Sequence, residues 1–359
     1  MAEKTINQYE PDTVSPPGET LLETLEMHGL SQAELAVRTG RPKQAINEII
    51  NGKKEITAET ALQLENVLGV PAHFWLAREQ NFRESLARQA EAERLEEHTE
   101  LLKRFPIKEM VSRGFLAARE TAVDQLRELL RFFSAGGPDE LTNLCLLTQT
   151  AFRQSSIFEA DTGALNAWLR QGEIIGQQTE TGSYNKYGFI AALQKARALT
   201  CVKAPDFLEP LKQLCAASGV VVAFVPELPK MRTSGATRWL KQDKALIQLS
   251  LRFRWADSIW FSFFHEAGHI VLHGKKEVFL EDHEESARED EANKFARDTL
   301  ISPERWAPFV EAGDFSDKAI HYFAKLIEIH PCIVVGRLQY EKLVSYSALR
   351  HLKPQFEWK

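Results

Sequence analysis

The chain has 359 residues, of which 44% are hydrophobic, and its 44 basic and 50 acidic side chains give a formal net charge of −6. This length exceeds one ordinary domain and predicts about two or three units, each with enough apolar surface for a core. The mildly acidic balance excludes a protein that binds nucleic acid through its overall charge. Any such binding therefore needs a local basic patch.

The sequence contains no stretch typical of secretion or membrane insertion. Its first residues lack an apolar run of signal-peptide type, and no later segment approaches the roughly 20 apolar residues that span a bilayer. We therefore expect a cytoplasmic protein with no membrane partner. The cysteines lie far apart without a C-x-x-C pair, which indicates reduced thiols packed as small hydrophobic side chains. They are Cys145, Cys201, Cys215 and Cys332.

The first part of the chain predicts an arm followed by a helical bundle. Residues 1–15 are mostly polar and precede Pro16 and Pro17, so we interpret them as a flexible arm. Residues 16–82 contain five short helical segments, each bounded by a glycine, a serine or threonine cap, or a proline in the first turn. This pattern predicts a compact bundle of five helices.

The remaining chain predicts a helical middle region and an α+β C-terminal domain, in a protein that is mainly α. Residues 83–204 have helical periodicity and dense charges of both signs, which indicates a helical connector or arm. Within residues 205–345, a β-branched apolar run at 219–228 predicts a strand, and apolar runs around a turn at 241–244 predict a hairpin. We expect a small antiparallel sheet packed with helices, and a tail at 346–359.

Residues 31–50, "SQAELAVRTGRPKQAINEII", have helix-turn-helix form. Ser31 can cap the first helix while Glu34 answers at the third position. Ala36 is small where the two helices cross, and Gly40 can make the turn between them. The residues from Arg41 onward then open the second helix, where side chains reach base edges in proteins of this form.

The charges of this region favour DNA as its partner. Residues 1–80 carry 7 basic and 12 acidic side chains, a net charge of −5, but residues 38–54 carry five basic and one acidic, a net charge of +4. Amide side chains can pair bidentately with adenine, and arginine with guanine. A helical bundle used only for protein contacts is the alternative. The expected DNA-contacting residues are Arg41, Lys43, Gln44, Asn47, Lys53 and Lys54.

Residues 16–82 resemble the XRE helix-turn-helix family. The stretches "PGE", "ITAETALQLENVLG" and "FWL" make the segment particularly similar to antitoxins of the HigA type. The resemblance implies transcription regulation within a toxin–antitoxin system. We expect a homodimer that binds a double-stranded DNA operator.

A second motif, "HEAGH", places His265, Glu266 and His269 in the spacing His-Glu-x-x-His. Residues four apart share one face of a helix, so the two histidines can bind one ion while Glu266 points toward its open position. Imidazole ligands at this spacing suit zinc. The flanking residues are apolar and predict a buried helix whose polar residues form a single stripe. That stripe consists of Ser258, Ser262, His265, His269 and His273.

Two interpretations of this stripe are open, a metal site and a pair of core histidines held by hydrogen bonds. A catalytic zinc needs a third protein ligand and one position for water. His273 is a poor third ligand, because each step of four residues advances a straight helix by about 40° and carries the side chain past the ion. We interpret His273 as a residue at the end of the helix that could contact one of the metal-binding side chains without binding the metal itself.

The acidic segment at 281–291 offers a better third ligand. Ala292 lies on the expected buried side of the following helix, and three residues earlier stands Glu289, our preferred ligand. Glu291 falls on a neighbouring face and is the second choice. Asn293, four residues after Glu289, is placed to support one of the two histidines.

Residues 205–345 resemble the ImmA/IrrE family of metallopeptidases. The likeness rests on "GVVVAFVPEL", "GATRWL", "IQLSLR", "WFSFFHEAGHIVLHG", "EDEANKFARDTLISP" and "HPCIVVGRLQYE". It implies a zincin-like fold with one zinc ion per chain, bound by His265, His269 and Glu289, and Glu266 as catalytic base. It also implies zinc-dependent cleavage of a partner repressor, antitoxin or toxin.

The expected chemistry is peptide hydrolysis. Zinc lowers the pKa of bound water to about 7, and Glu266 would take its proton and pass it to the leaving amine. A substrate peptide could add to a sheet edge near "ALIQLSL". His321, Tyr322 and His330 are weaker candidates for oxyanion donors.

Two classes of function fit the sequence. The first is a DNA-binding regulator with a zinc-dependent endopeptidase domain. The second is a non-enzymatic HigA-like antitoxin or repressor that uses the metallopeptidase-like domain as a sensor or partner-binding module. The intact set of His265, Glu266, His269 and Glu289 favours the first.

Overall fold

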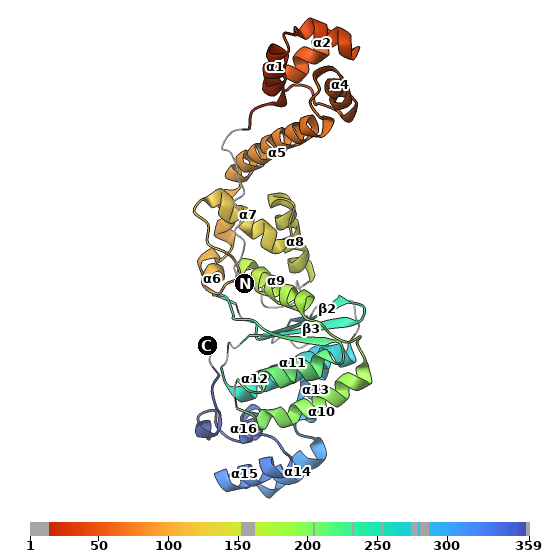
Figure 1. Cartoon of the computed structure of the whole chain (residues 1–359). Helices are drawn as coiled ribbons and strands as arrows, with labels where there is room; N and C mark the ends of the chain where they lie inside the picture. Colours follow the sequence, from red (N-terminus) through yellow and green to blue (C-terminus); the bar gives the residue numbers. More distant parts are fainter. Residues whose placement is uncertain are drawn as a thin grey trace. The chain divides into compact units, whose positions relative to one another are not determined.

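The computed structural model describes residues 14–151, 162–203, 205–231, 233–250, 252, 254–273, 279–280 and 287–356 (Figure 1). The chain forms two compact units, Met1–His98 and Thr99–Lys359. Most of the expected arm at residues 1–15 lies outside the described residues. Each unit has its own hydrophobic core, as the composition predicts.

The first unit contains the five predicted helices. The capping box is present, since Ser31 Oγ accepts from the Glu34 N–H at 3.2 Å and the Glu34 carboxylate accepts from the Ser31 N–H at 2.8 Å. Gly40 ends the helix in the left-handed region, with φ of 66°. The five helices are α1 (Pro17–Met27), α2 (Gln32–Thr39), α3 (Lys43–Ile50), α4 (Ala58–Leu68) and α5 (Ala72–Glu97).

One core holds this bundle together. Leu21, Leu35, Ile46, Leu64 and Trp75, one from each helix, are completely buried and belong to one hydrophobic cluster. Helix α5 runs without a break to Glu97, so it extends well beyond the predicted domain end at residue 82.

The second unit is also mainly helical. The helices before the sheet are η1 (Thr99–Arg104), α6 (Ile107–Ser112), α7 (Ala122–Phe133), α8 (Pro138–Ala151), α9 (Thr162–Gln178), α10 (Lys186–Ala198), η3 (Leu199–Cys201) and α11 (Leu208–Ala216). Those after the sheet's hairpin are α12 (Ala256–Leu272), α13 (Ala287–Leu300), α14 (Pro303–Ala312), α15 (Asp317–Leu326), α16 (Pro331–Tyr340) and η4 (Arg350–Leu352). No single described helix is long and apolar enough to cross a membrane, and the one pair that passes together, α15 with α16, is bent by 114°.

The sheet is mixed, with the order β1-β3-β2-β4. The predicted hairpin is present, and the small sheet that was expected to be antiparallel is mixed, because β1 pairs parallel with β3. The chain direction reverses between β1 and β2. The hairpin then places β3 between these two strands, parallel to β1. A peptide therefore cannot add to β3, which is paired on both sides. The strands are β1 (Val220–Phe224), β2 (Gly235–Lys241), β3 (Lys244–Leu249) and β4 (Phe279–Leu280).

Helices α9 and α12 cover opposite faces of this sheet (Figure 1). Gln248 of β3 donates to the carbonyl oxygen of Trp168 on α9 at 2.6 Å. Ile247 points to the other face, and its antiparallel partner Thr237 contacts Glu266 on α12. Helix α9, from the predicted connector, is thus one layer around the sheet.

The C-terminal segment packs against the start of α12. Ala256 N–H donates to Pro354 O at 2.9 Å, and Phe356 N–H donates to Arg254 O at 2.7 Å. Lys353 and Asp257 form an ion pair of 2.7 Å in which both side chains are nearly buried. The last described residues therefore help to hold the helix that carries the "HEAGH" motif.

Candidate metal centre and nucleic-acid interface

Helix α12 presents the two motif histidines inside the second unit. Its apolar residues, among them Trp260, Phe263 and Phe264, are buried in the large hydrophobic cluster. His265 and His269 are each only 1% exposed, and their rings lie on the same face one turn apart. The predicted buried helix with one polar stripe is present.

Gly268 lets α13 come close to α12. A Cβ atom at Gly268 would stand 3.2 Å from both the Cα of Ala292 and a ring carbon of Phe295. Ala292 is fully buried at this contact. Small residues on both helices thus bring the first turn of α13, which carries Glu289, to the histidines.

Three ligand-type atoms converge where the helices meet. Glu289 Oε2 lies 3.1 Å from His265 Nε2, Glu289 Oε1 lies 3.3 Å from His269 Nε2, and the two Nε2 atoms are 3.0 Å apart. All three side chains offer a ligand atom within 4.8 Å of the others, a group that could hold one metal ion. Two imidazole nitrogens and a carboxylate are a donor set that suits zinc and leaves one tetrahedral position for water.

The electrostatics of the cluster favour an ionised Glu289 and a neutral His269. Burial opposes ionisation of Glu289, but hydrogen bonds from His265 and His269 outweigh it and lower the pKa of Glu289 to about 2. Burial also lowers the pKa of His269 below its usual value of 6.5. Near neutral pH, an ionised carboxylate therefore faces a neutral imidazole, the states in which both groups bind metal.

A second ring of contacts orients the histidines. Asn293 Oδ1 lies 2.9 Å from His265 Nδ1, which is the contact expected for Asn293. His273 Nδ1 lies 3.0 Å from His269 Nδ1, and its Nε2 lies 3.1 Å from Glu291. Each histidine of the cluster thus has its Nδ1 atom in contact with a polar side chain, an arrangement that fixes the ring and the tautomer in metal sites.

The two acidic candidates have different positions. The side chain of Glu289 is 13% exposed and contacts both ligand histidines, whereas that of Glu291 is 62% exposed and contacts His273. Glu289 therefore belongs to the cluster of ligand atoms, and Glu291 does not.

Glu266 is completely buried next to the cluster and rests against strand β2. Thr237 Oγ1 lies 2.5 Å from Glu266 Oε2 and 3.1 Å from the main-chain oxygen of the same residue. Sequence reasoning missed Thr237, because nothing in the spacing shows which strand residue faces α12.

The weaker candidates for oxyanion donors lie in α15 and at the start of α16. The ring of His330 caps α16 and accepts from the Cys332 N–H at 3.1 Å. His321 Nδ1 contacts the main-chain oxygen of Asp317 at 2.8 Å, and Tyr322 is exposed. The structure thus gives His321 and His330 local partners in α15 and α16 and leaves Tyr322 on the surface.

In the first unit, one face of α3 is free of core contacts. Lys43, Gln44 and Asn47 are exposed on it, while Ala45, Ile46, Ile49 and Ile50 on the opposite face are buried. Asn51, which sequence reasoning missed, follows on the exposed face and donates to Asn47 Oδ1 at 2.8 Å. Its position one turn after Asn47 was the available signal.

Arg41 is engaged with α4. Its Nε donates to Gln63 Oε1 at 2.6 Å, and its Nη2 lies 3.5 Å from Glu59. These contacts leave Arg41 less available for bases than the exposed residues of α3. Lys53 and Lys54, which follow α3, are exposed.

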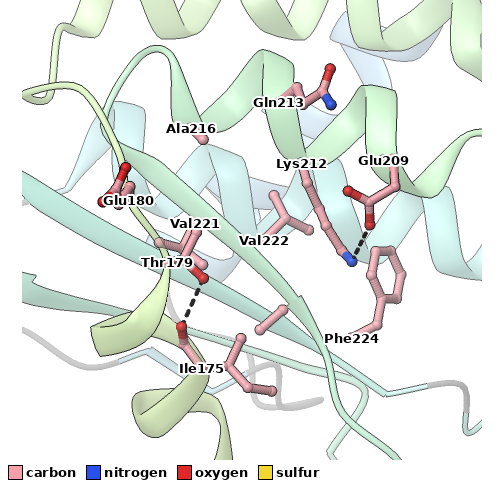
Figure 2. Close-up of a pocket in the computed structure, with 11 residues that line it drawn as sticks. Ile175, Thr179, Glu180, Glu209, Lys212, Gln213, Ala216, Val221, Val222 and Phe224 are labelled. Atoms are coloured by element: carbon pink, nitrogen blue, oxygen red, sulfur yellow. Dashed lines mark hydrogen bonds and ion pairs between the residues drawn. The ribbon is translucent and has the colours of Figure 1, made fainter. Parts of the chain in front are cut away.

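A pocket of about 390 Å³ lies elsewhere in the second unit. It is lined by the end of α9 with Ile175, by α11 with Lys212 and by β1 with Val222 and Phe224 (Figure 2). Lys212 is paired with Glu209 at 2.7 Å on its rim. No residue of the His265–His269–Glu289 cluster lines this pocket.

Comparisons with known proteins concern the first unit. Residues 21–75 match the family model HTH_3, described as helix-turn-helix. None of the curated protein sequences matches the chain. Similar solved structures include an addiction module antidote protein of a HigA family from Coxiella burnetii, 30% identical, which covers 23% of this chain and 92% of its own with a TM-score of 0.22.

Two further structures are similar over the same part of the chain. A putative antidote protein of a plasmid maintenance system from Nostoc punctiforme is 31% identical, with 23% of this chain and 91% of its own covered and a TM-score of 0.23. The Pseudomonas aeruginosa antitoxin HigA with higBA promoter is 26% identical, with 24% and 94% covered and a TM-score of 0.22. The family match, together with the capped helices and the turn at Gly40, identifies residues 21–75 as a helix-turn-helix domain.

Proposed function

We propose that this chain is a DNA-binding regulator with a zinc-dependent endopeptidase domain that cleaves a partner repressor or antitoxin. The convergence of His265, His269 and Glu289, with Glu266 buried beside them, carries the proposal. The resemblance of residues 205–345 to ImmA/IrrE metallopeptidases supports it. The helix-turn-helix match supports the DNA-binding part.

In this mechanism His265, His269 and Glu289 would hold the zinc. When bound, zinc would supply Lewis-acid chemistry for peptide hydrolysis. Glu266 takes a proton from the attacking water at its carboxylate and delivers it to the leaving amine. Asn293 and His273 keep the two imidazoles in place during these steps.

In the first unit, α3 is the proposed recognition helix. Its exposed Lys43, Gln44 and Asn47 would face the major groove, and Lys53 and Lys54 would contact phosphates. A homodimer on a two-fold operator is the arrangement that this kind of motif favours. The DNA-binding unit would then bring the peptidase to a promoter where its protein substrate also binds.

A second candidate function follows from the helix-turn-helix match alone. The chain could be a non-enzymatic HigA-like antitoxin or repressor in which the metallopeptidase-like domain serves as a sensor or a partner-binding module. The similar structures named above are antitoxins or antidote proteins, which is the observation that favours this candidate.

Glu266→Gln tests the first candidate. Gln keeps the size of the side chain but cannot take a proton, so the variant should bind zinc like the wild type and cleave nothing. Zinc content is measured by elemental analysis, and cleavage is followed with the purified product of the neighbouring gene.

Glu291→Gln is the matched control, because Glu291 contacts His273 but is not one of the three proposed metal ligands. It should retain both zinc and cleavage. A wild type that holds zinc and binds its promoter but leaves the neighbouring gene product intact would establish the second candidate instead.

A further inference from the structure

We propose that Thr237 is a positioning residue that holds the carboxylate of Glu266 beside the His265–His269–Glu289 cluster, with Gly235 providing the space for it. Both residues belong to strand β2, which lies against α12. This role rests on the proposed peptidase function. It gives the site a residue that orients the general base, which none of the three proposed metal ligands does.

The hydroxyl of Thr237 is well placed to fix the carboxylate. It lies 2.5 Å from Glu266 Oε2, and the two residues are 1% and 0% exposed. Because both residues are buried, no bulk water is at hand to replace this contact. The main-chain oxygen of Glu266, 3.1 Å from the same hydroxyl oxygen, lies in the same turn of α12.

The backbone of Thr237 is itself held on both sides. It pairs with Ile247 of β3 and with Phe279 of β4. Its β-branched side chain has few rotamers. The hydroxyl therefore has a fixed position, against which the longer and more flexible side chain of Glu266 is set.

Gly235 stands two residues before Thr237 and faces the same side of the sheet. A Cβ atom there would lie 2.5 Å from Glu266 Oε1 and 2.8 Å from Glu266 Cγ. The φ angle of Gly235 is not in the positive range, so space and not backbone conformation requires a glycine. Thr237 and Gly235 thus define one position for the carboxylate, by a donor and by the absence of a side chain.

A general base works only when it is held within hydrogen-bond reach of the proton it removes, and a displacement of about 1 Å can cost about a hundredfold in rate. Thr237→Val keeps the shape of the side chain and removes the donor. It should lower kcat for the neighbouring gene product by about ten- to a hundredfold, with KM and zinc content unchanged. Thr237→Ser keeps the hydroxyl and should restore most of kcat.

Thr200→Val is the matched control. Thr200 is a buried threonine of the same unit, and its hydroxyl donates to Arg197 O at 2.8 Å and has no hydrogen bond to Glu266. It should lower stability while leaving kcat unchanged. Equal losses of kcat in Thr200→Val and Thr237→Val, or no rescue by Thr237→Ser, would overturn the positioning role.

A double-mutant cycle provides a readout that needs no cleavage. Thr237→Val should raise the unfolding equilibrium constant about tenfold in the wild type but clearly less in Glu266→Ala, where the carboxylate is absent. Additive effects in urea unfolding at saturating zinc would refute the contact. Coupling without cleavage by the wild type would leave Thr237 as the holder of Glu266 and reject the proposed peptidase function.

Gly235→Ala completes the test. The added methyl group should displace the carboxylate, so kcat should fall at least as far as in Thr237→Val while zinc remains bound. Wild-type kcat in Gly235→Ala would show that the position of Glu266 does not depend on this space.

Discussion

Gly268 on α12 lies against Ala292 on α13, so closely that a Cβ atom at Gly268 would stand 3.2 Å from the Cα of Ala292. This contact lies one residue before His269 and three residues after Glu289 in the chain. The two helices therefore approach each other where the ligand atoms must meet. The geometry of the candidate metal centre therefore depends on Gly268, which is not itself one of the candidate metal ligands.

Gly268→Ala should weaken metal binding more than it weakens the fold. The methyl group pushes α13 outward by a few tenths of an ångström, which moves Glu289 away from the histidines and should lower zinc affinity about tenfold. The helix itself gains about 1 kcal/mol from alanine, which offsets part of the crowding. Zinc competition with a chromophoric chelator measures the affinity. The control is Gly188→Ala in α10, where the atom nearest to the added methyl group is the rotatable hydroxyl of Ser218, and it should leave zinc affinity unchanged. Wild-type zinc affinity in Gly268→Ala would contradict the prediction.

Glu289 and Glu291 should differ sharply in their importance for the metal. Glu289→Gln should lose most of the bound zinc, because a neutral amide oxygen replaces an ionised ligand between two imidazoles. Glu291→Gln should keep about one zinc per chain, since it loses only an exposed contact with His273. Elemental analysis after dialysis distinguishes them, and the opposite pattern would place the third ligand at Glu291.

The proximity of His265, His269 and Glu289 could be predicted from sequence because helical geometry alone determines most of it. His265 and His269 share a face by their spacing, and the apolar positions around Ala292 place Glu289 and Asn293 on the facing side of the next helix. Thr237 could not be found in this way. It is 29 residues from Glu266 in the chain, and only the register of the strands shows that it faces α12.

Local and long-range features of the chain differ in the same way elsewhere. The five helices of the first unit follow from local signals such as the Ser31 cap and the turn at Gly40. The parallel pairing of β1 with β3 depends on a connection between distant strands, on which local patterns are silent. Arg41 was expected at a base edge from its place before α3, but its long side chain reaches Gln63 on α4.

Arg41→Ala should therefore change stability more than base preference. Loss of the contacts with Gln63 and Glu59 should lower the free energy of unfolding by about 1 kcal/mol. Gln44→Ala and Asn47→Ala should instead relax the preference at one or two base pairs, by about 1–3 kcal/mol each. Selection of binding sites from random DNA duplexes measures the preference. If Arg41→Ala changes the selected sequence, Arg41 must leave α4 when DNA binds.

Lys353→Met should destabilise the second unit by about 3 kcal/mol, because it leaves the nearly buried carboxylate of Asp257 without its cation. The surroundings of Asp257 are tightly packed, because Gly336 lies so close that a Cβ atom there would stand 2.5 Å from Asp257 Oδ2. The site therefore cannot easily rearrange around a carboxylate that has lost its cation. Adding Asp257→Asn should recover part of the loss. Urea unfolding measures both variants, and Lys212→Met, at an exposed ion pair, is the control with little expected effect. Equal small effects of the two lysine variants would show that the C-terminal segment does not depend on this pair.

Glu173 should give the second unit a measurable dependence on acid. Burial raises the pKa of Glu173, but Arg238 and Arg170, at 3.1 and 2.9 Å, outweigh burial and hold that pKa below its usual value of 4.5. The unfolded chain therefore takes up the proton first as the pH falls. The stability contributed by Glu173 is present above pH 4.5 and is lost as the pH falls below 4.5 toward the pKa of the folded state.

Glu173→Gln tests this dependence because glutamine cannot titrate. The variant should be less stable than the wild type by about 1–2 kcal/mol near pH 7, less than for a fully buried pair since Glu173 is 29% exposed. The difference should shrink steadily once the pH falls below 4.5. Urea unfolding between about pH 3 and pH 7 measures it. Glu209→Gln, whose partner Lys212 is exposed, should show little difference at any pH; a constant gap between wild type and Glu173→Gln would mean that the residue acts through packing and not through its charge.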